Sequence, residues 1–132
     1  MSDRYQTICI VDDDPSVCKA LSRLIKLAGF KAKSYISGRE LLDDNQLGSI
    51  DLLLLDIKMP VMDGFALQNH LAIIGFNIPF IFMTAHDVET ARTIAMGKNA
   101  VAFLQKPFEE KDLLDAINKG LKIISPQSET HQ

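Results

Sequence analysis

The chain has 132 residues, of which 47% are hydrophobic and 23% charged, and its formal net charge is −3. These values are typical of one globular domain, and they disfavour a general binder of nucleic acid or of anionic membranes. The N-terminus lacks the apolar core of a signal peptide, the most apolar stretch is too short to span a bilayer, and two cysteines cannot make a disulfide framework, so we expect a cytoplasmic protein.

The first strand and helix are predicted from an apolar run followed by two helix-start residues. Thr7–Val11 is apolar and indicates a strand, and Asp14 follows as a helix N-cap with Pro15 at the first helical position. The helix then keeps one apolar face until Gly29 ends it. That face is expected to consist of Val17, Leu21, Leu24, Ile25 and Ala28.

The next two strands differ in character. Lys31–Tyr35 alternates and carries two lysines, which suits the edge of a sheet. Leu52–Leu55 is apolar on both faces and suits a central position. Between these strands, Ser37 and Glu40 have the spacing of a capping box, which predicts a short helix to about Asp44.

The alternation of strands and helices continues in the second half of the chain. A third helix is expected to end at Gly75, and Phe80–Met83 forms the fourth strand. Asp87 is expected to cap a fourth helix that runs to about Lys98. The inward-facing residues of these two helices are expected to be Leu67, Leu71, Ile74, Ala91, Ile94 and Ala95.

The last strand and helix complete a domain over residues 1–124, and residues 125–132 form a polar tail that we expect to be disordered. Asn99 follows the fourth helix and is the non-glycine residue best suited to the left-handed backbone that ends many helices. Val101–Leu104 is the fifth strand. The last helix is expected to bury Leu113, Leu114, Ile117, Leu121 and Ile124.

Five polar residues lie at or just past the ends of four predicted strands, namely Asp12, Asp13, Asp56, Thr84 and Lys106. Short apolar runs separated by helices predict an α/β fold with a buried parallel sheet. In such sheets, ligands bind where the carboxyl ends of the strands meet. We therefore expect three carboxylates, a hydroxyl and an ammonium to converge on one pocket, a set that suits a divalent cation and a phosphoryl group.

The adjacent Asp12 and Asp13 indicate a Mg²⁺ site, because like charges held close together repel unless a cation is present. Mg²⁺ takes one or two carboxylates and keeps several waters. The expected ligands are Asp13, Asp56 and the backbone carbonyl of Lys58, with Asp12 acting through a water. In the alternative interpretation the acidic run merely opens a helix, where it suits the helix dipole, and Asp14 is assigned that role.

Asp56 is the residue expected to carry the chemistry. A carboxylate that attacks a phosphoryl group forms an acyl phosphate, which is a known form of covalent catalysis. Lys106 would pair with the phosphoryl oxygens, Thr84 would donate its hydroxyl to another of them, and the small Ala85 would leave room for the group. The Lys106–Pro107 bond is expected to be cis, which would turn the lysine back over the pocket.

The pocket residues extend into a longer set of motifs across about residues 6–124, namely Asp12-Asp13, Asp56, Met59-Pro60, Asp63-Gly64, Thr84-Ala85 and Lys106-Pro107-Phe108. This set resembles the receiver domain of two-component response regulators. The resemblance implies a flavodoxin-like, doubly wound sheet of strand order 2-1-3-4-5 with five helices. The runs at 11–15 and 103–108 are similar to those of a subgroup whose members often carry a helix-turn-helix output domain.

The resemblance also implies a signalling switch and not an ordinary enzyme. In this family, the residue that matches Asp56 accepts a phosphoryl group from the phosphohistidine of a histidine kinase or phosphotransfer protein, and Mg²⁺ is required. The chain itself would contribute only Mg²⁺-dependent self-phosphorylation and slow self-dephosphorylation. No direct contact with nucleic acid or with a membrane is expected.

Further residues match family positions that transmit or time the signal. Thr84 matches the switch hydroxyl and Phe103 the aromatic switch. The surface of the fourth helix, fifth strand and fifth helix is therefore expected to change and to bind an output partner or a second copy. Lys58 and His86 match positions that commonly tune hydrolysis of the aspartyl phosphate; alternatively, both side chains simply point to solvent.

Three functional classes remain open at this point. The first is a phosphoacceptor switch without an output domain, since only residues 125–132 follow the last helix. The second is a receiver cut from a longer DNA-binding regulator or hybrid kinase, with the polar tail as part of a linker. The third is a phosphatase of the haloacid-dehalogenase type, which Asp12 and Asp14 superficially fit, although the second acid after Asp56 and a cap domain are missing.

Overall fold

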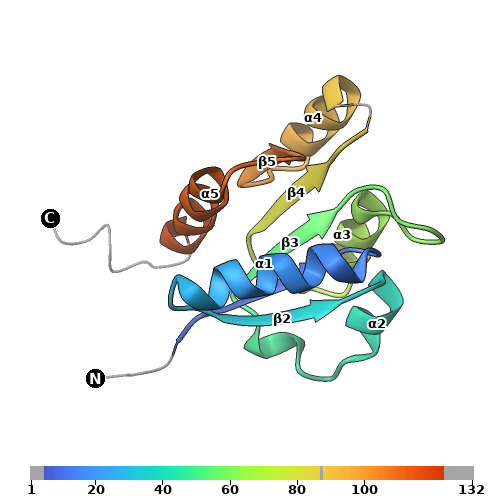
Figure 1. Cartoon of the computed structure of the whole chain (residues 1–132). Coiled ribbons are helices and arrows are strands. Elements are labelled where there is room, and N and C mark those ends of the chain that lie inside the picture. Colours follow the sequence, from blue (N-terminus) through green and yellow to red (C-terminus); the bar gives the residue numbers. More distant parts are fainter. Residues whose placement is uncertain (1–4, 87, 124–132) are drawn as a thin grey trace, which may run out of the picture.

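A five-stranded parallel sheet with helices on both faces forms the molecule (Figure 1). The computed structural model describes residues 5–86 and 88–123. The sheet has the order β2-β1-β3-β4-β5, which confirms the expected fold. The strands are β1 (Thr7–Val11), β2 (Lys31–Tyr35), β3 (Leu52–Asp56), β4 (Phe80–Thr84) and β5 (Ala102–Gln105). The helices of the described residues are α1 (Pro15–Leu27), α2 (Gly38–Asp43), α3 (Gly64–Ile73), α4 (Val88–Gly97) and α5 (Glu110–Ile123), with a 3₁₀ turn at Leu47–Ser49.

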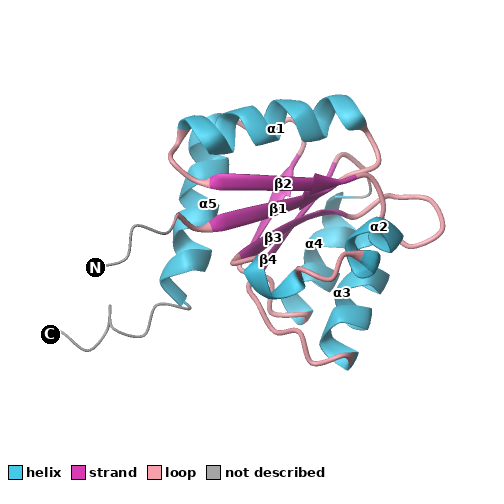
Figure 2. Cartoon of the chain, turned by 90° about the horizontal axis from the view of Figure 1, so that it is seen from below, coloured by secondary structure: helices cyan, strands magenta, loops and turns pink. Residues whose placement is uncertain are grey.

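Both faces of the sheet are buried because each strand alternates its side chains between two layers of helices. Leu52 and Leu54 of β3 face the layer formed by α1 and α5, whereas Leu53 and Leu55 face the layer formed by α2, α3 and α4. Figure 2 shows these two layers on either side of the sheet. The inner strands β1 and β3 are buried throughout, and β2 lies at the edge as its lysines predict.

The residues that cap the helices explain where several of them begin and end. The Asp14 side chain accepts a hydrogen bond from the Ser16 N–H at 2.9 Å, and Ser37 Oγ accepts one from the Glu40 N–H at 3.1 Å. These bonds satisfy backbone donors that have no partner inside the helix. Asn99 has a left-handed backbone with φ of 65°, as predicted, two residues beyond the end of α4.

The bounds of three strands differ from those predicted. β3 and β4 each extend one residue further, so Asp56 and Thr84 are the last residues of their strands. β5 begins and ends one residue later than expected. The residues added at the strand ends, Asp56, Thr84 and Gln105, are polar, so a prediction from apolar runs left them out. Their backbones nevertheless pair with the neighbouring strand.

The prediction that Ala28, Ile74 and Ile94 face inward is wrong, because all three residues are exposed. Ala28 and Ile74 are the C-caps of α1 and α3, beyond the last turn that packs on the sheet. On α4, the buried residues are Ala91 and Ala95, and Ile94 lies on the flank of the helix. The buried face of α4 is therefore narrow and consists of small side chains.

Some expectations fall outside the described residues. These are the cap at Asp87, the burial of Ile124 and the polar tail 125–132. Within residues 5–86 and 88–123, no helix has both the length and the apolar character needed to cross a membrane.

Candidate functional site

Three carboxylates meet at the carboxyl ends of β1 and β3, which are neighbours in the sheet. Because Val11 pairs with Leu55, the residues that follow them, Asp12 and Asp56, reach the same edge. One carboxylate oxygen from each of Asp12, Asp13 and Asp56 lies within 4.8 Å of the other two. Asp12 and Asp56 are only 1% and 4% exposed, whereas Asp13 is exposed. The sheet therefore gathers two buried acids and one accessible acid at a single point.

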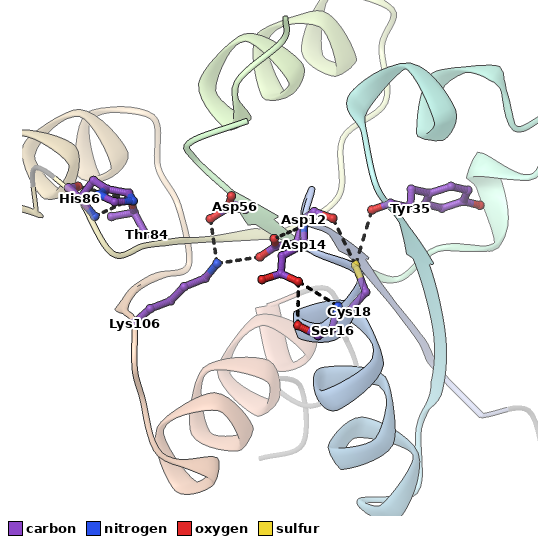
Figure 3. Close-up of polar contacts among 9 residues, drawn as sticks. All are labelled: Asp12, Asp14, Ser16, Cys18, Tyr35, Asp56, Thr84, His86 and Lys106. Carbon is purple, nitrogen blue, oxygen red and sulfur yellow. Dashed lines mark hydrogen bonds and ion pairs between the residues drawn. The ribbon is translucent and has the colours of Figure 1, made fainter. Parts of the chain in front are cut away.

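Lys106 brings a positive charge to this acidic cluster (Figure 3). Its Nζ donates to Asp12 Oδ2 at 2.7 Å and to Asp56 Oδ1 at 3.0 Å. The Lys106 N–H donates to the Thr84 carbonyl at 2.8 Å, just past β5, and the following bond to Pro107 is cis, as predicted. Burial opposes the charged ammonium, but the hydrogen bonds to Asp12 and Asp56 outweigh it and raise the pKa of Lys106.

Burial raises the pKa of Asp56 to about 6, and the negative charges of Asp12 and Asp13 act in the same direction. The hydrogen bond and the charge of Lys106 lower this pKa and offset part of the rise. A carboxyl group with a pKa of about 6 is still mostly ionised at pH 7. Asp56 is thus a buried carboxylate in the ionised form that a nucleophile requires.

Thr84 is fully buried at the end of β4, but its hydroxyl bonds within its own loop. Its Oγ1 accepts from the His86 N–H at 3.2 Å and donates to the His86 carbonyl at 3.3 Å. Ala85 and His86 are both exposed. Figure 3 shows Thr84 and His86 as a pair beside the group formed by Asp12, Asp56 and Lys106. The bond that Thr84 donates to the His86 carbonyl must break before its hydroxyl can donate elsewhere.

The loop from β3 to α3 closes tightly over the end of β3. The Gly64 N–H donates to the Ile57 carbonyl at 2.9 Å, and a Cβ on Gly64 would collide with the Asp56 carbonyl oxygen. Asp63 caps α3 from the same loop. Lys58 lies here with an exposed side chain, and ligation by its backbone carbonyl stays a prediction. The Asp63-Gly64 pair thus holds the loop against the strand that carries Asp56.

Phe103 lies on β5 opposite Phe82 of β4. Its ring is half-buried and packs against the core layer of α2, α3 and α4. The guanidinium carbon of Arg92, on α4, lies 4.8 Å from the centroid of this ring.

The family model of the response regulator receiver domain matches residues 8–118, a span that contains the acidic cluster and Lys106. The chain belongs to this family. A receiver domain is a signalling module rather than a classical enzyme. This match agrees with the two receiver classes considered from the sequence and gives no support to a phosphatase of the haloacid-dehalogenase type.

Named relatives agree with this assignment. The receiver is 39% identical to the response regulator protein TmoT of Ectopseudomonas mendocina, over 98% of this chain and 59% of that protein. It is 34% identical to nodulation protein W of Bradyrhizobium diazoefficiens, over 83% and 48%. Among solved structures, response regulator StyR has 38% identity and a TM-score of 0.85, covering 95% of this chain and 63% of StyR. FixJ-N has 32% identity and a TM-score of 0.80, covering 92% and 96%.

The acidic cluster of the receiver fits Mg²⁺ by the chemistry of its donors. Carboxylate oxygens are the protein ligands that Mg²⁺ prefers, and three of them lie close enough to approach one ion. Asp12 uses one oxygen for Lys106 and the other for the Asp14 N–H, at 2.9 Å. This leaves Asp13 and Asp56 as the acids better placed for direct ligation.

Sequence reasoning missed the contacts of two residues of the receiver, Lys106 and Arg92. It paired Lys106 with the phosphoryl oxygens alone, whereas its ammonium already contacts Asp12 and Asp56. It also gave no role to Arg92, because a cation over a ring depends on the distance between a helix and a strand. The one available signal for this contact was the position of Arg92, a positive residue that directly follows the buried Ala91 on α4.

Proposed function

We propose that this receiver is the phosphoacceptor of a two-component phosphorelay and that Asp56 takes the phosphoryl group. The observation that supports this most is the position of Asp56. It is buried, ionised at neutral pH, contacted by Lys106 and flanked by Asp12 and Asp13. The donor would be the phosphohistidine of a histidine kinase or phosphotransfer protein.

In the proposed reaction, an Asp56 carboxylate oxygen attacks the phosphorus atom and forms a P–O bond. The P–N bond to the donor imidazole breaks, and the imidazole takes up a proton. The Lys106 ammonium would give up its hydrogen bond to Asp56 and donate to the oxygens of the transferred group instead. When bound, Mg²⁺ would neutralise the charge that builds up on those oxygens. Asp13, Asp56 and the Lys58 carbonyl would hold the ion, with Asp12 acting through a water.

The signal would then leave the site through Thr84. If its hydroxyl leaves His86 and donates to a phosphoryl oxygen, space opens behind it, and Phe103 can turn inward. Ala85 would leave room for the group, and the rim residues Lys58 and His86 would set how fast it hydrolyses. The surface of α4, β5 and α5 would change and bind an output partner or a second copy.

A second candidate is the same receiver acting as part of a longer DNA-binding response regulator or hybrid kinase. The chain spans 59% of TmoT and 63% of StyR, so these relatives contain further sequence. A cytoplasmic location is part of either proposal and is supported by the free, buried thiols of Cys9 and Cys18.

Incubation with acetyl phosphate and Mg²⁺, followed by intact-mass measurement, tests the proposal. Wild type should gain the mass of one phosphoryl group, and Asp56→Asn should not. Asp43→Asn is a matched control, because Asp43 is an exposed aspartate on α2 and should leave labelling unchanged. Labelling that persists in Asp56→Asn and disappears in Asp12→Asn would contradict the assignment of the acceptor.

A further inference from the structure

Arg92 and Phe103 connect α4 to β5 through a contact between a cation and an aromatic face. The guanidinium carbon lies 4.8 Å from the ring centroid, inside the roughly 6 Å range of an attractive cation–π contact. Ala91 and Ala95 are buried and fix how α4 sits on the sheet. Arg92, next to Ala91, is thereby placed beside the neighbouring strand.

The ring is the charge-specific partner that the structure gives to Arg92. Within residues 5–86 and 88–123, Arg92 makes no ion pair with an acidic side chain. Phe103 is half-buried, so part of the ring packs in the core and part is available to the guanidinium. An exposed cation can therefore affect the position of a ring that belongs partly to the core.

We propose that Arg92 is a positioning residue that holds Phe103 where it now lies and opposes its inward turn. The effect on signalling rests on the proposed function, whereas the effect on the resting ring does not. A ring that turns inward behind Thr84 leaves the guanidinium and loses the contact. A cation–π contact at an exposed site shifts such an equilibrium about two- to five-fold.

Fluorine NMR of the full chain, with a fluorinated phenylalanine at position 103, measures where the ring lies. In the unphosphorylated chain, Arg92→Gln should raise the inward population about two- to five-fold, and Arg92→Lys should restore most of the wild-type value. Lys98→Gln is the matched control. It removes the cation beyond α4 that lies 5.9 Å from the Phe65 ring, and it should leave Phe103 unchanged.

A fluorination series separates the cation–π contact from simple packing. Each added fluorine withdraws electrons from the ring face and weakens its attraction for a cation with little change in ring size. With arginine at position 92, the inward population should rise stepwise with fluorine number, and in Arg92→Gln this dependence should vanish. In the arm that keeps Arg92, fluorination of the ring is the only change, so the stepwise rise does not depend on the stability of a variant.

Three results would overturn the inference: an unchanged ring signal in Arg92→Gln, an equal change in Lys98→Gln, or a fluorine dependence that persists without Arg92. A ring signal that responds to Arg92→Gln but not to acetyl phosphate with Mg²⁺ would support the role of Arg92. That same result would contradict the switch proposed for Phe103, so the two ideas can fail separately.

Discussion

Lys106 directs a single positive charge at an acidic cluster that contains three carboxylates. Its bonds to Asp12 and Asp56 compensate for part of the repulsion, and Asp13 adds further negative charge at the exposed side. The pKa of Asp56 is raised to about 6, first by burial and then by the charges of Asp12 and Asp13, and Lys106 offsets only part of this rise. A bound cation should therefore stabilise the folded receiver, and a bound anion alone should destabilise it. An anion that binds together with a cation need not have this effect.

Replacing Asp56 by Asn should stabilise the metal-free receiver at neutral pH. Because the pKa of Asp56 is raised on folding, wild type loses stability as pH rises from about 4 to about 6, whereas Asn does not titrate. The gain should be on the order of 1–3 kcal/mol at pH 7 and should fade below pH 4. Urea unfolding in EDTA at several pH values measures it. If Asp56→Asn were less stable than wild type at pH 7, this would contradict the conclusion that the charge of Asp56 destabilises the metal-free receiver.

Asp13→Asn should weaken Mg²⁺ binding and leave the metal-free stability equal or slightly higher, since one repulsive charge is removed. Asp14→Ala is the control. It removes the cap on α1 and should cost about 1 kcal/mol with little effect on Mg²⁺ affinity. Titration with Mg²⁺ and urea unfolding in EDTA provide the two readouts. A clear loss of metal-free stability in Asp13→Asn would mean that Asp13 is a structural residue.

The β3–α3 loop is the element that places Asp56. The strand ends at Asp56, the Ile57 N–H still pairs with the Met83 carbonyl, and the Gly64 N–H returns to the Ile57 carbonyl. The turn back toward β3 needs a residue without a side chain at position 64. Loop and strand therefore form one unit, and a change in the loop should alter the position of Asp56.

Gly64→Ala should destabilise the receiver by about 1–3 kcal/mol, because its Cβ would meet backbone atoms of Asp56 and Ile57 that cannot move aside alone. Gly48→Ala is the matched substitution in open space, with no atom within 4 Å of the new Cβ, and should have a small effect. Equal losses in the two variants, measured by urea unfolding, would argue against this close approach.

The elements differ in how far the sequence predicts them. The bounds of β1 and β2 are correct, because an apolar run and an alternating lysine strand are strong local signals. The ends of β3 and β4 were missed because Asp56 and Thr84 pair by backbone alone. Convergence of the acids follows from parallel strands, so it was predictable. The hydrogen bonds of Thr84 with His86 were not, since they depend on the path of one loop.

The whole molecule places its site where the strand order reverses direction, between β1 and β3. Helices of both layers start near this edge, and α4 and β5 lie on one side of it (Figure 1). In the proposed reaction, a phosphoryl group on Asp56 would add a charge of nearly −2 close to Lys106 and Thr84. The free energy for any change of the α4–β5–α5 surface would therefore come from a few contacts, those of Lys106 and Thr84, at one end of the sheet.

Phosphorylation alone should switch the receiver only in part. A shift from 1:99 to 99:1 needs about 5.5 kcal/mol, and one charge-assisted pair with one hydrogen bond supplies about half of that. Fluorine NMR of Phe103 in the phosphorylated chain should therefore show both ring positions. A single unchanged resonance with phosphate on Asp56 would contradict the aromatic switch.

Chemical trapping of the acceptor is the most direct test of the central claim that Asp56 carries the phosphoryl group. Borohydride reduces an acyl phosphate to an alcohol, so a phosphorylated aspartate becomes homoserine and can be located by peptide sequencing. After treatment with acetyl phosphate and Mg²⁺, we expect homoserine at position 56. Homoserine at position 12 or 13, or a phosphoryl group on a residue that borohydride leaves unchanged, would contradict the account.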